Sequence, residues 1–179
     1  MTTTRAWKLS FEGKNQGSAW LLGNDVSTDD IISGKYLEIR EVDALSKHVL
    51  EGIVLDFPFK IKAGDVIVAG DNFGCGSSRE QAPALLKHLG VGSIFAKSFA
   101  RIFFRNGINI GLPLITIPGD VVSAFKTGEK VVYTIDPPVL ENATSGKRFQ
   151  ALAFPAFFLN ILRHGGAIPL LKADLAKKK

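Results

Sequence analysis

The residues best suited to chemistry in this sequence are a serine, a serine and an arginine at 77–79. They end a glycine-rich segment, 70–78, which follows an apolar run at 66–69 and leads into a helical pattern. Glycine lets a backbone approach a ligand closely, and the start of a helix presents free N–H groups to an anion. Arg79 adds a planar cation that can bind a carboxylate through two hydrogen bonds. We therefore predict a pocket for a carboxylate or a phosphate, with both serines at the start of the helix.

A serine in this place is also a candidate base. Its alkoxide is unstable in water, but backbone N–H groups aimed at the oxygen stabilise the negative charge. Removal of a proton next to a carboxylate further requires a cation or a metal to stabilise the charge that develops on the substrate. Arg79 supplies part of that charge, and the chain has no evident set of metal ligands. A structural alternative stays open, in which a serine caps the helix and Arg79 forms a surface ion pair.

Other reactive side chains carry weaker signals. The three histidines, at 48, 88 and 164, are too far apart in sequence to indicate a metal site. Cys75 is the only cysteine, so the chain forms no internal disulfide and cannot supply the thiolates of an iron–sulfur cluster. Arg101 and Arg105 are spaced i, i+4 and so share one helix face. They indicate a second anion site or an interface, unless that face is simply solvated.

The elements that must position these residues alternate between strands and helices. Apolar or β-branched runs predict strands at 18–22, 66–69, 93–96 and 114–117. Apolar spacing predicts helices at 41–50, 79–89 and 99–105, the last of them capped by Ser98. Further β segments are expected near 120–135 and 148–153, followed by a short helix at 157–163. This order is typical of a mixed α/β protein, and we expect a single domain over residues 1–179.

Length, composition and charge restrict the function further. With 179 residues, 46% of them hydrophobic and 22% charged, the chain fits one globular domain rather than a disordered protein or a coiled coil. The net charge of +5 includes a terminal lysine run, 177–179, and a local excess over 71–115, where five Lys and Arg face two Asp and Glu. This local charge favours a small anion over a nucleic acid as partner.

The same sequence shows no sign of a membrane segment. No apolar run reaches the ~20 residues of a membrane span, and residues 1–9 lack the apolar core of a signal peptide. We therefore expect a cytoplasmic protein that contacts neither a membrane nor a nucleic acid.

Around the serine pair the sequence becomes more specific. Residues 70–83 read Gly-Asp-Asn-Phe-Gly-Cys-Gly-Ser-Ser-Arg-Glu-Gln-Ala-Pro, which resembles the signature of the small subunits of 3-isopropylmalate dehydratase. These subunits are the detached swivel domain of the aconitase superfamily. Residues 98–106 and 111–114 resemble the next block of that family, and 24–32 is similar to its early Asp/Thr-rich turn. The resemblance is strongest over about residues 15–118.

The resemblance implies a swivelling β/β/α domain and a two-subunit hydro-lyase. The partner would be a large subunit carrying a [4Fe–4S] cluster, so this chain would hold no cofactor, form a hetero-oligomer and be inactive alone. The reaction would convert 2-isopropylmalate to 3-isopropylmalate in leucine biosynthesis, by dehydration and rehydration. Ser77 would take the role of general base, and Ser78 and Arg79 would hold a carboxylate of a small 2-hydroxy di- or tricarboxylic acid.

The resemblance also places a substrate-selecting loop at Tyr36, Leu37, Glu38 and Ile39. In related enzymes an apolar residue in this loop suits an isopropyl group, whereas an arginine suits the extra carboxylate of homoaconitate. Glu38 matches neither pattern, and a shifted register would bring Ile39 or Arg40 into its place. Homoaconitate, citramalate or citraconate, and 2,3-dimethylmalate are therefore alternative substrates. A stand-alone anion-binding module is the alternative from another class of function.

Overall fold

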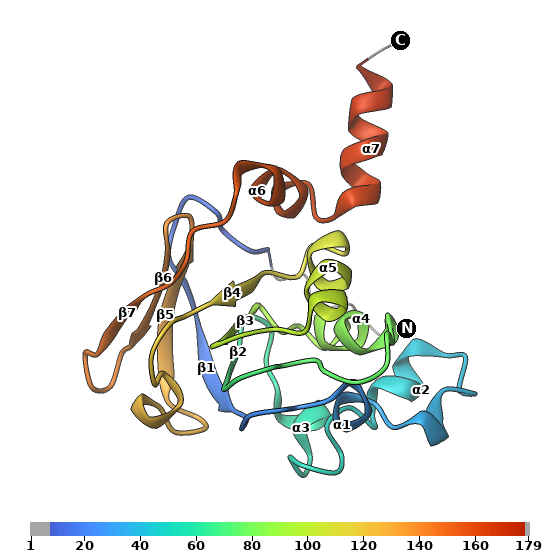
Figure 1. The fold of residues 1–179 in the computed structure, drawn as a ribbon, viewed down its shortest axis with the longest axis horizontal. Helices are drawn as coiled ribbons and strands as arrows, with labels where there is room; N and C mark the ends of the chain where they lie inside the picture. The colour runs from blue at the N-terminus through green and yellow to red at the C-terminus, as the bar shows by residue number, and fades with distance from the viewer. Residues whose placement is uncertain (1–7, 178–179) are drawn as a thin grey trace.

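A single seven-stranded sheet organises the protein, whose structure is a computed structural model that describes residues 8–177 (Figure 1). The strands are β1 (Asn15–Leu21), β2 (Val66–Ala69), β3 (Ser93–Ala96), β4 (Leu114–Thr116), β5 (Lys130–Ile135), β6 (Pro138–Asn142) and β7 (Arg148–Gln150). Their order in space is β4-β3-β2-β1-β5-β6-β7. Strands β1 to β4 are parallel, and β5 to β7 continue the sheet in antiparallel pairs. The sheet is therefore mixed, with β1 at the junction of its two halves.

Seven helices accompany the sheet within the described residues. They are α1 (Thr28–Ile31), α2 (Val42–Ser46), α3 (Phe57–Lys60), α4 (Gln81–His88), α5 (Arg101–Asn109), α6 (Ala156–Arg163) and α7 (Ala167–Ala176). Short 3₁₀ helices occupy Gly34–Tyr36 and Val122–Ala124. Helices α4 and α5 lie side by side against the parallel strands, whereas α7 extends away from the body (Figure 1). None of the helices in residues 8–177 combines the length and apolar character needed to cross a membrane.

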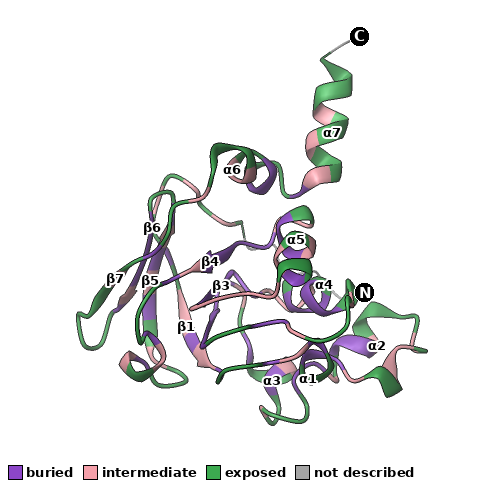
Figure 2. Cartoon of the chain, in the orientation of Figure 1, coloured by how far each residue is buried: buried purple, intermediate pink, exposed green. Residues whose placement is uncertain are grey.

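Strands β2 and β3, in the parallel half of the sheet, are buried at every residue (Figure 2). The side chains of β2 alternate between two apolar clusters. Ile67 and Ala69 join the cluster under the helices, whereas Val66 and Val68 join a second cluster with residues of β5 and β6. Strands covered on both faces read as continuous apolar runs rather than alternating ones. This explains why the sequence at 66–69, Val-Ile-Val-Ala, is apolar throughout.

A buried carboxylate fixes the junction between the two halves. Asp65, just before β2, accepts hydrogen bonds from the Ser18 N–H at 2.7 Å and from Trp20 Nε1 at 3.0 Å. Next to it the Tyr133 hydroxyl donates to the Gly64 carbonyl at 3.0 Å. Burial, and then the charge of Asp65, raise the pKa of Tyr133 well above its usual value. The amino end of β2 is thus tied to the middle of β1.

Most of the predicted elements up to residue 117 are confirmed, although several of their bounds shift by a few residues. The strands at 66–69 and 93–96 have the predicted limits. The helix predicted over 41–50 ends at Ser46. A turn follows over 47–50, and Leu50 has a left-handed backbone with φ 58°. Ser98 does not cap α5, whose cap position is Ala100. The Ser98 hydroxyl instead accepts the Asn72 N–H at 2.8 Å and so supports the glycine-rich loop.

The C-terminal third departs further from the prediction. The segment expected to be β near 120–135 begins with a 3₁₀ helix, and strand β6 was not predicted. Helix α7 was missed as well, because Pro169 normally disfavours a helix. It lies in the first turn of α7, where the N–H that proline lacks would have no partner in the helix. The terminal lysine run, 177–179, lies partly outside the described residues, and so does most of the N-terminal segment 1–9.

Candidate functional site

Two loops run side by side at the carboxyl edge of the sheet. One follows β1 and the other follows β2, and parallel neighbours end at the same edge. Backbone hydrogen bonds join them, among them Asp25 N–H to Asp71 O at 2.8 Å, Gly74 N–H to Val26 O at 2.7 Å, and Thr28 N–H to Cys75 O at 2.8 Å. The early Asp/Thr-rich turn therefore forms one wall of the site that the serines and Arg79 occupy.

Glycine is required in the second loop by close packing. Gly74 has φ 78°, and a Cβ there would lie 2.1 Å from Cγ of Phe103 in α5. A Cβ on Gly70 would lie 1.9 Å from the Asn24 side-chain oxygen. The sequence analysis assigned these glycines to a close approach of ligand. At these two positions they instead allow a close approach of the protein to itself, which fixes the path of the loop.

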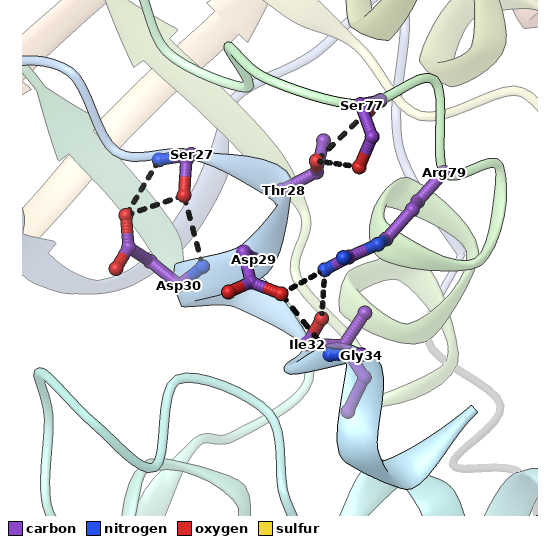
Figure 3. A network of polar contacts seen from close by, with 8 residues as sticks. All are labelled: Ser27, Thr28, Asp29, Asp30, Ile32, Gly34, Ser77 and Arg79. Atoms are coloured by element: carbon purple, nitrogen blue, oxygen red, sulfur yellow. Dashed lines mark hydrogen bonds and ion pairs between the residues drawn. The ribbon is translucent and has the colours of Figure 1, made fainter. Parts of the chain in front are cut away.

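The Ser77 hydroxyl is presented at the surface with Thr28 behind it (Figure 3). Thr28 is buried and its hydroxyl donates to the Ser77 carbonyl at 2.8 Å. The same Thr28 oxygen lies 3.4 Å from Ser77 Oγ. Because its proton is directed at the carbonyl, Thr28 can accept from the Ser77 hydroxyl. Thr28 therefore orients Ser77, a role that the sequence analysis did not identify.

The prediction that both serines lie at the start of the helix is wrong. Helix α4 begins at Gln81, and Ser77 and Ser78 precede it by four and three residues. A turn separates them from the helix, because the Arg79 N–H donates to the Ser77 carbonyl at 2.8 Å. The cap position is Glu80, whose side chain makes no capping bond. Ser78 is exposed, and its side chain has no hydrogen-bond partner in the described part of the chain.

Arg79 points back to the turn after β1 (Figure 3). Its Nη1 donates to the Asp29 carboxylate and, at 2.9 Å, to the Ile32 carbonyl. The Arg79 side chain is 20% exposed and that of Asp29 62%, so the pair lies at the rim of the site. Both of these bonds use Nη1, and no group among residues 8–177 forms a hydrogen bond with Arg79 Nε or Nη2. The ion pair that the sequence analysis left as the structural alternative is present, and it leaves part of the guanidinium free for an anion.

Arg79 also controls the ionisation of Asp29. The hydrogen bond from Arg79, and then that from the Gly34 N–H, hold the pKa of the Asp29 carboxyl below its usual value. Because this pKa is lower in the folded chain than in the unfolded chain, the pair stabilises the fold at pH values above the unfolded-state pKa. That stabilisation is lost as the pH falls through the folded-state pKa. The pair is therefore fully formed at neutral pH.

The Asp29 pKa can be measured directly by carbon NMR of the carboxyl group. We expect a value below that of a free aspartate in the wild-type chain. In Arg79→Ala the pKa of Asp29 should rise, because the hydrogen bond from Arg79 contributes most to lowering it. The hydrogen bond from the Gly34 N–H should still keep this pKa slightly below that of a free aspartate. Identical titration curves in the two proteins would contradict the pairing.

The loop that the sequence predicts to select the substrate lies against this pair. The Gly34 N–H donates to the same Asp29 oxygen that Arg79 contacts, at 3.0 Å. After Gly34, the side chains of Tyr36, Leu37 and Ile39 are half-buried against the apolar cluster under the helices, and Glu38 is exposed. Leu37 and Ile39 therefore anchor the loop on the apolar cluster, whereas the exposed side chains, Glu38 and Arg40, are charged.

Arg101 and Arg105 lie apart from these contacts, on α5. Both are exposed, and neither forms an ion pair with a described residue. Together with Ser98, Phe99, Phe104 and Thr116 they line a cavity of ≈ 380 Å³. The structure thus gathers Ser77, Arg79 and the selecting loop at one edge, with the two arginines on the helix that follows β3.

The residues that the sequence analysis missed are Thr28 and Asp29. A partial signal existed, because Ser27 and Asp30 have the spacing of a capping box. Ser27 Oγ accepts the Asp30 N–H at 3.1 Å, and the Asp30 carboxylate accepts the Ser27 N–H at 2.8 Å. This box spans the start of α1, and the two residues inside it are the ones that contact Ser77 and Arg79.

The described residues do not form a metal centre. No three His, Cys, Asp or Glu side chains among residues 8–177 are grouped so that they could hold an ion. Cys75 is partly buried and its thiol lies 3.4 Å from the Asp25 carbonyl. One thiolate is too few for an iron–sulfur cluster, so such a group does not fit this chain.

Comparison with known proteins agrees with this geometry. Residues 29–119 match the family described as the aconitase C-terminal domain. The 3-isopropylmalate dehydratase small subunit 1 of Methanopyrus kandleri is 46% identical over 89% of this chain and 93% of that protein. The methanogen homoaconitase small subunit of Methanothermobacter thermautotrophicus is also 46% identical, over 88% of this chain and 90% of that protein.

A solved structure agrees with the fold. The crystal structure of 3-isopropylmalate dehydratase from Methanocaldococcus jannaschii superposes with a TM-score of 0.85 at 40% identity, and covers 93% of this chain and 100% of that one. The predicted fold class is therefore confirmed. The chain belongs to the aconitase C-terminal domain family, among the small subunits of 3-isopropylmalate dehydratase and its relatives.

Proposed function

We propose that this chain is the small subunit of a hydro-lyase that converts 2-isopropylmalate to 3-isopropylmalate. The observation that carries the proposal is an exposed Ser77 hydroxyl and a partly free Arg79 guanidinium that contact adjacent residues of one turn, Thr28 and Asp29. A base and a carboxylate-binding cation on one rim are what removal of a proton α to a carboxylate requires. The family to which the chain belongs contains subunits named for this reaction.

Each residue has a distinct task in the proposed reaction. The alkoxide form of Ser77 takes the proton from one carbon, the electrons of that C–H bond form the C=C bond, and hydroxide leaves the neighbouring carbon. A water then adds its hydroxyl group to the carbon that lost the proton, and its remaining proton neutralises the hydroxide that left. Ser77 returns its proton to the neighbouring carbon and is again an alkoxide. Arg79 and Ser78 hold a carboxylate so that the two carbons stay in place.

The remaining part of the site is proposed to lie on a large subunit. A [4Fe–4S] cluster held there would supply a Lewis acid that polarises the hydroxyl group and a carboxylate of the substrate. A reducing compartment suits such a partner and the unpaired thiol of Cys75, so we also propose a cytoplasmic location.

The substrate is tested with a panel of acids. The chain is coexpressed with a [4Fe–4S] large subunit, and the purified complex is assayed anaerobically with 2-isopropylmalate, citramalate, 2,3-dimethylmalate and homocitrate. We expect the highest kcat/KM for 2-isopropylmalate. Arg40 is exposed and favours homocitrate as the second candidate, since it could bind a further carboxylate. Activity on homocitrate alone would move the assignment to homoaconitase, and a complex inactive on all four acids would contradict the function.

We further propose that the large subunit contacts the arginine face of α5. Arg101 and Arg105 lack carboxylate partners within the described chain and stand beside the apolar rings of Phe99 and Phe104. Charged groups of this kind speed association and select a complementary acidic surface. The double variant Arg101→Glu/Arg105→Glu should therefore weaken the complex about tenfold or more at low salt.

Calorimetric titration of one subunit into the other measures this effect. The variant Lys147→Glu/Arg148→Glu changes the charge by the same amount at the turn into β7 and serves as the control. Equal affinities of the two double variants would show that the α5 face is solvated.

A further inference from the structure

A compact group of side chains holds Tyr36, the first residue of the substrate-selecting loop. The Tyr36 hydroxyl donates to Glu51 Oε1 at 2.8 Å. The other Glu51 oxygen lies 2.7 Å from His48 Nδ1. The His48 and Tyr36 rings are stacked, with centroids 3.8 Å apart and planes 15° from parallel. Tyr36 is therefore fixed at its hydroxyl by one residue and across its ring by another.

Lys35 adds a cation to the same group. Its Nζ lies 3.8 Å from the Glu51 carboxylate and 4.6 Å from the centre of the Tyr36 ring. Hydrogen bonds from His48, and then from Tyr36, hold the pKa of Glu51 below its usual value. The Glu51 carboxylate is thus ionised at neutral pH and accepts from both neighbours.

The selecting loop is consequently held at two points. Just before the loop the Gly34 N–H is bonded to Asp29, the carboxylate that also orients Arg79. Two residues later Tyr36 is bonded to Glu51. A cavity of ≈ 230 Å³ lies between these anchors, lined by Asp29, Ser33, Lys35, Tyr36, His48 and Glu51 among others. The selecting loop and the carboxylate-binding arginine therefore share one framework.

An unusual backbone turn brings Glu51 back to the loop. Leu50 has φ 58°, a region that non-glycine residues seldom adopt. The Leu50 side chain is fully buried and its N–H donates to the Ile31 carbonyl at 2.9 Å. These two contacts hold Leu50 in this backbone conformation. The helical pattern predicted over 41–50 is broken here, and the reversal places Glu51 and His48 on the same side of Tyr36.

We propose that His48 and Glu51 are positioning residues that set the substrate specificity of the loop. By fixing Tyr36 they hold residues 34–39 in one conformation, so that the variable side group of the substrate meets one defined surface. The inference rests on the proposed function, because the loop selects only if the chain binds a 2-hydroxy acid. Exposed ion pairs add little to global stability. The effect should therefore appear in loop order and in selectivity, not in the Tm.

The loop order is measured by amide hydrogen exchange on the full chain, without any partner. The Leu37 N–H donates to Gly34 O at 3.2 Å and the Ile39 N–H to Tyr36 O at 3.0 Å, so both report on the loop. In Glu51→Ala and His48→Ala we expect about tenfold faster exchange at these amides with an unchanged Tm. Glu51→Gln keeps an acceptor for Tyr36 and should restore most of the protection.

A matched control separates the loop from general surface effects. Glu12→Ala removes an exposed carboxylate that precedes β1, at the opposite end of that strand from the loop. It should leave the exchange of Leu37 and Ile39 unchanged. Unaltered exchange in both Glu51→Ala and His48→Ala would overturn the inference.

Selectivity is measured in the complex with the large subunit. The quantity is the ratio of kcat/KM for 2-isopropylmalate to that for citramalate, which carries a methyl group in place of the isopropyl group. Glu51→Ala should lower this ratio about tenfold, mainly through KM, and Glu12→Ala should not. An unchanged ratio in an active Glu51→Ala complex would overturn the inference. A wild-type complex inactive on every acid would contradict the proposed function instead, and amide exchange distinguishes the two failures.

Discussion

Replacing Ser77 with alanine should lower kcat of the two-subunit complex by about 10²–10⁴, the usual contribution of a positioned general base. The fold should not change, because Ser77 is exposed and its Oγ has one contact within residues 8–177, the 3.4 Å approach to Thr28. The Thr28 hydroxyl keeps its stronger bond to the Ser77 carbonyl, which the substitution leaves in place. KM should change little, since Arg79 and Ser78 still hold the carboxylate.

The measurement is steady-state turnover together with thermal unfolding and subunit binding. Ser145→Ala, in the turn between β6 and β7, is the matched control and should be as active as the wild type. If Ser77→Ala retained near-normal turnover in a properly assembled complex, Ser77 would not be the base.

Arg79→Lys should lower kcat/KM by about 10–100-fold, with a large part of the loss in KM. Lysine keeps the positive charge but offers a single point of contact, whereas the guanidinium bonds Asp29 and Ile32 through Nη1 and keeps further N–H donors for the substrate. A lysine ammonium that bonds Asp29 has no second, rigidly placed nitrogen with which to bind the substrate carboxylate. The carboxylate would then be held less firmly and at a less defined angle.

Initial rates over a range of substrate concentrations separate KM from kcat in this variant. Arg148→Lys makes the same chemical change on β7 and should be silent. Unchanged KM and kcat in Arg79→Lys would show that Arg79 serves only the ion pair with Asp29.

The parallel half of the fold could be predicted because burial leaves a direct trace in the sequence. Strands covered on both faces are expected to be apolar throughout. Strand β2 is, and β3 departs from this only at Ser93, whose hydroxyl donates to the Pro113 carbonyl. Helix α7 could not be predicted in the same way, since Pro169 is a helix breaker everywhere except in a first turn. Strand β6 follows β5 closely and contains Pro138, a residue that argues against a strand in sequence alone.

The site shows a similar division between local and distant information. Ser77, Ser78 and Arg79 could be selected because they are adjacent and follow a glycine-rich segment. Their position relative to α4 could not, because a backbone bond from Arg79 to Ser77 inserts a turn before the helix. Asp29 lies fifty residues from Arg79 in sequence, and only the pairing of β1 with β2 brings the two together.

The central claim is that this chain supplies half of an active site that a large subunit completes. Its most direct test is to mix the two purified subunits anaerobically and follow the conversion of 2-isopropylmalate to 3-isopropylmalate by NMR. Neither subunit alone should turn over the substrate, and activity should rise with added small subunit until the two are equimolar. A large subunit that is fully active without this chain, or an assembled complex that leaves the substrate unchanged, would contradict the claim.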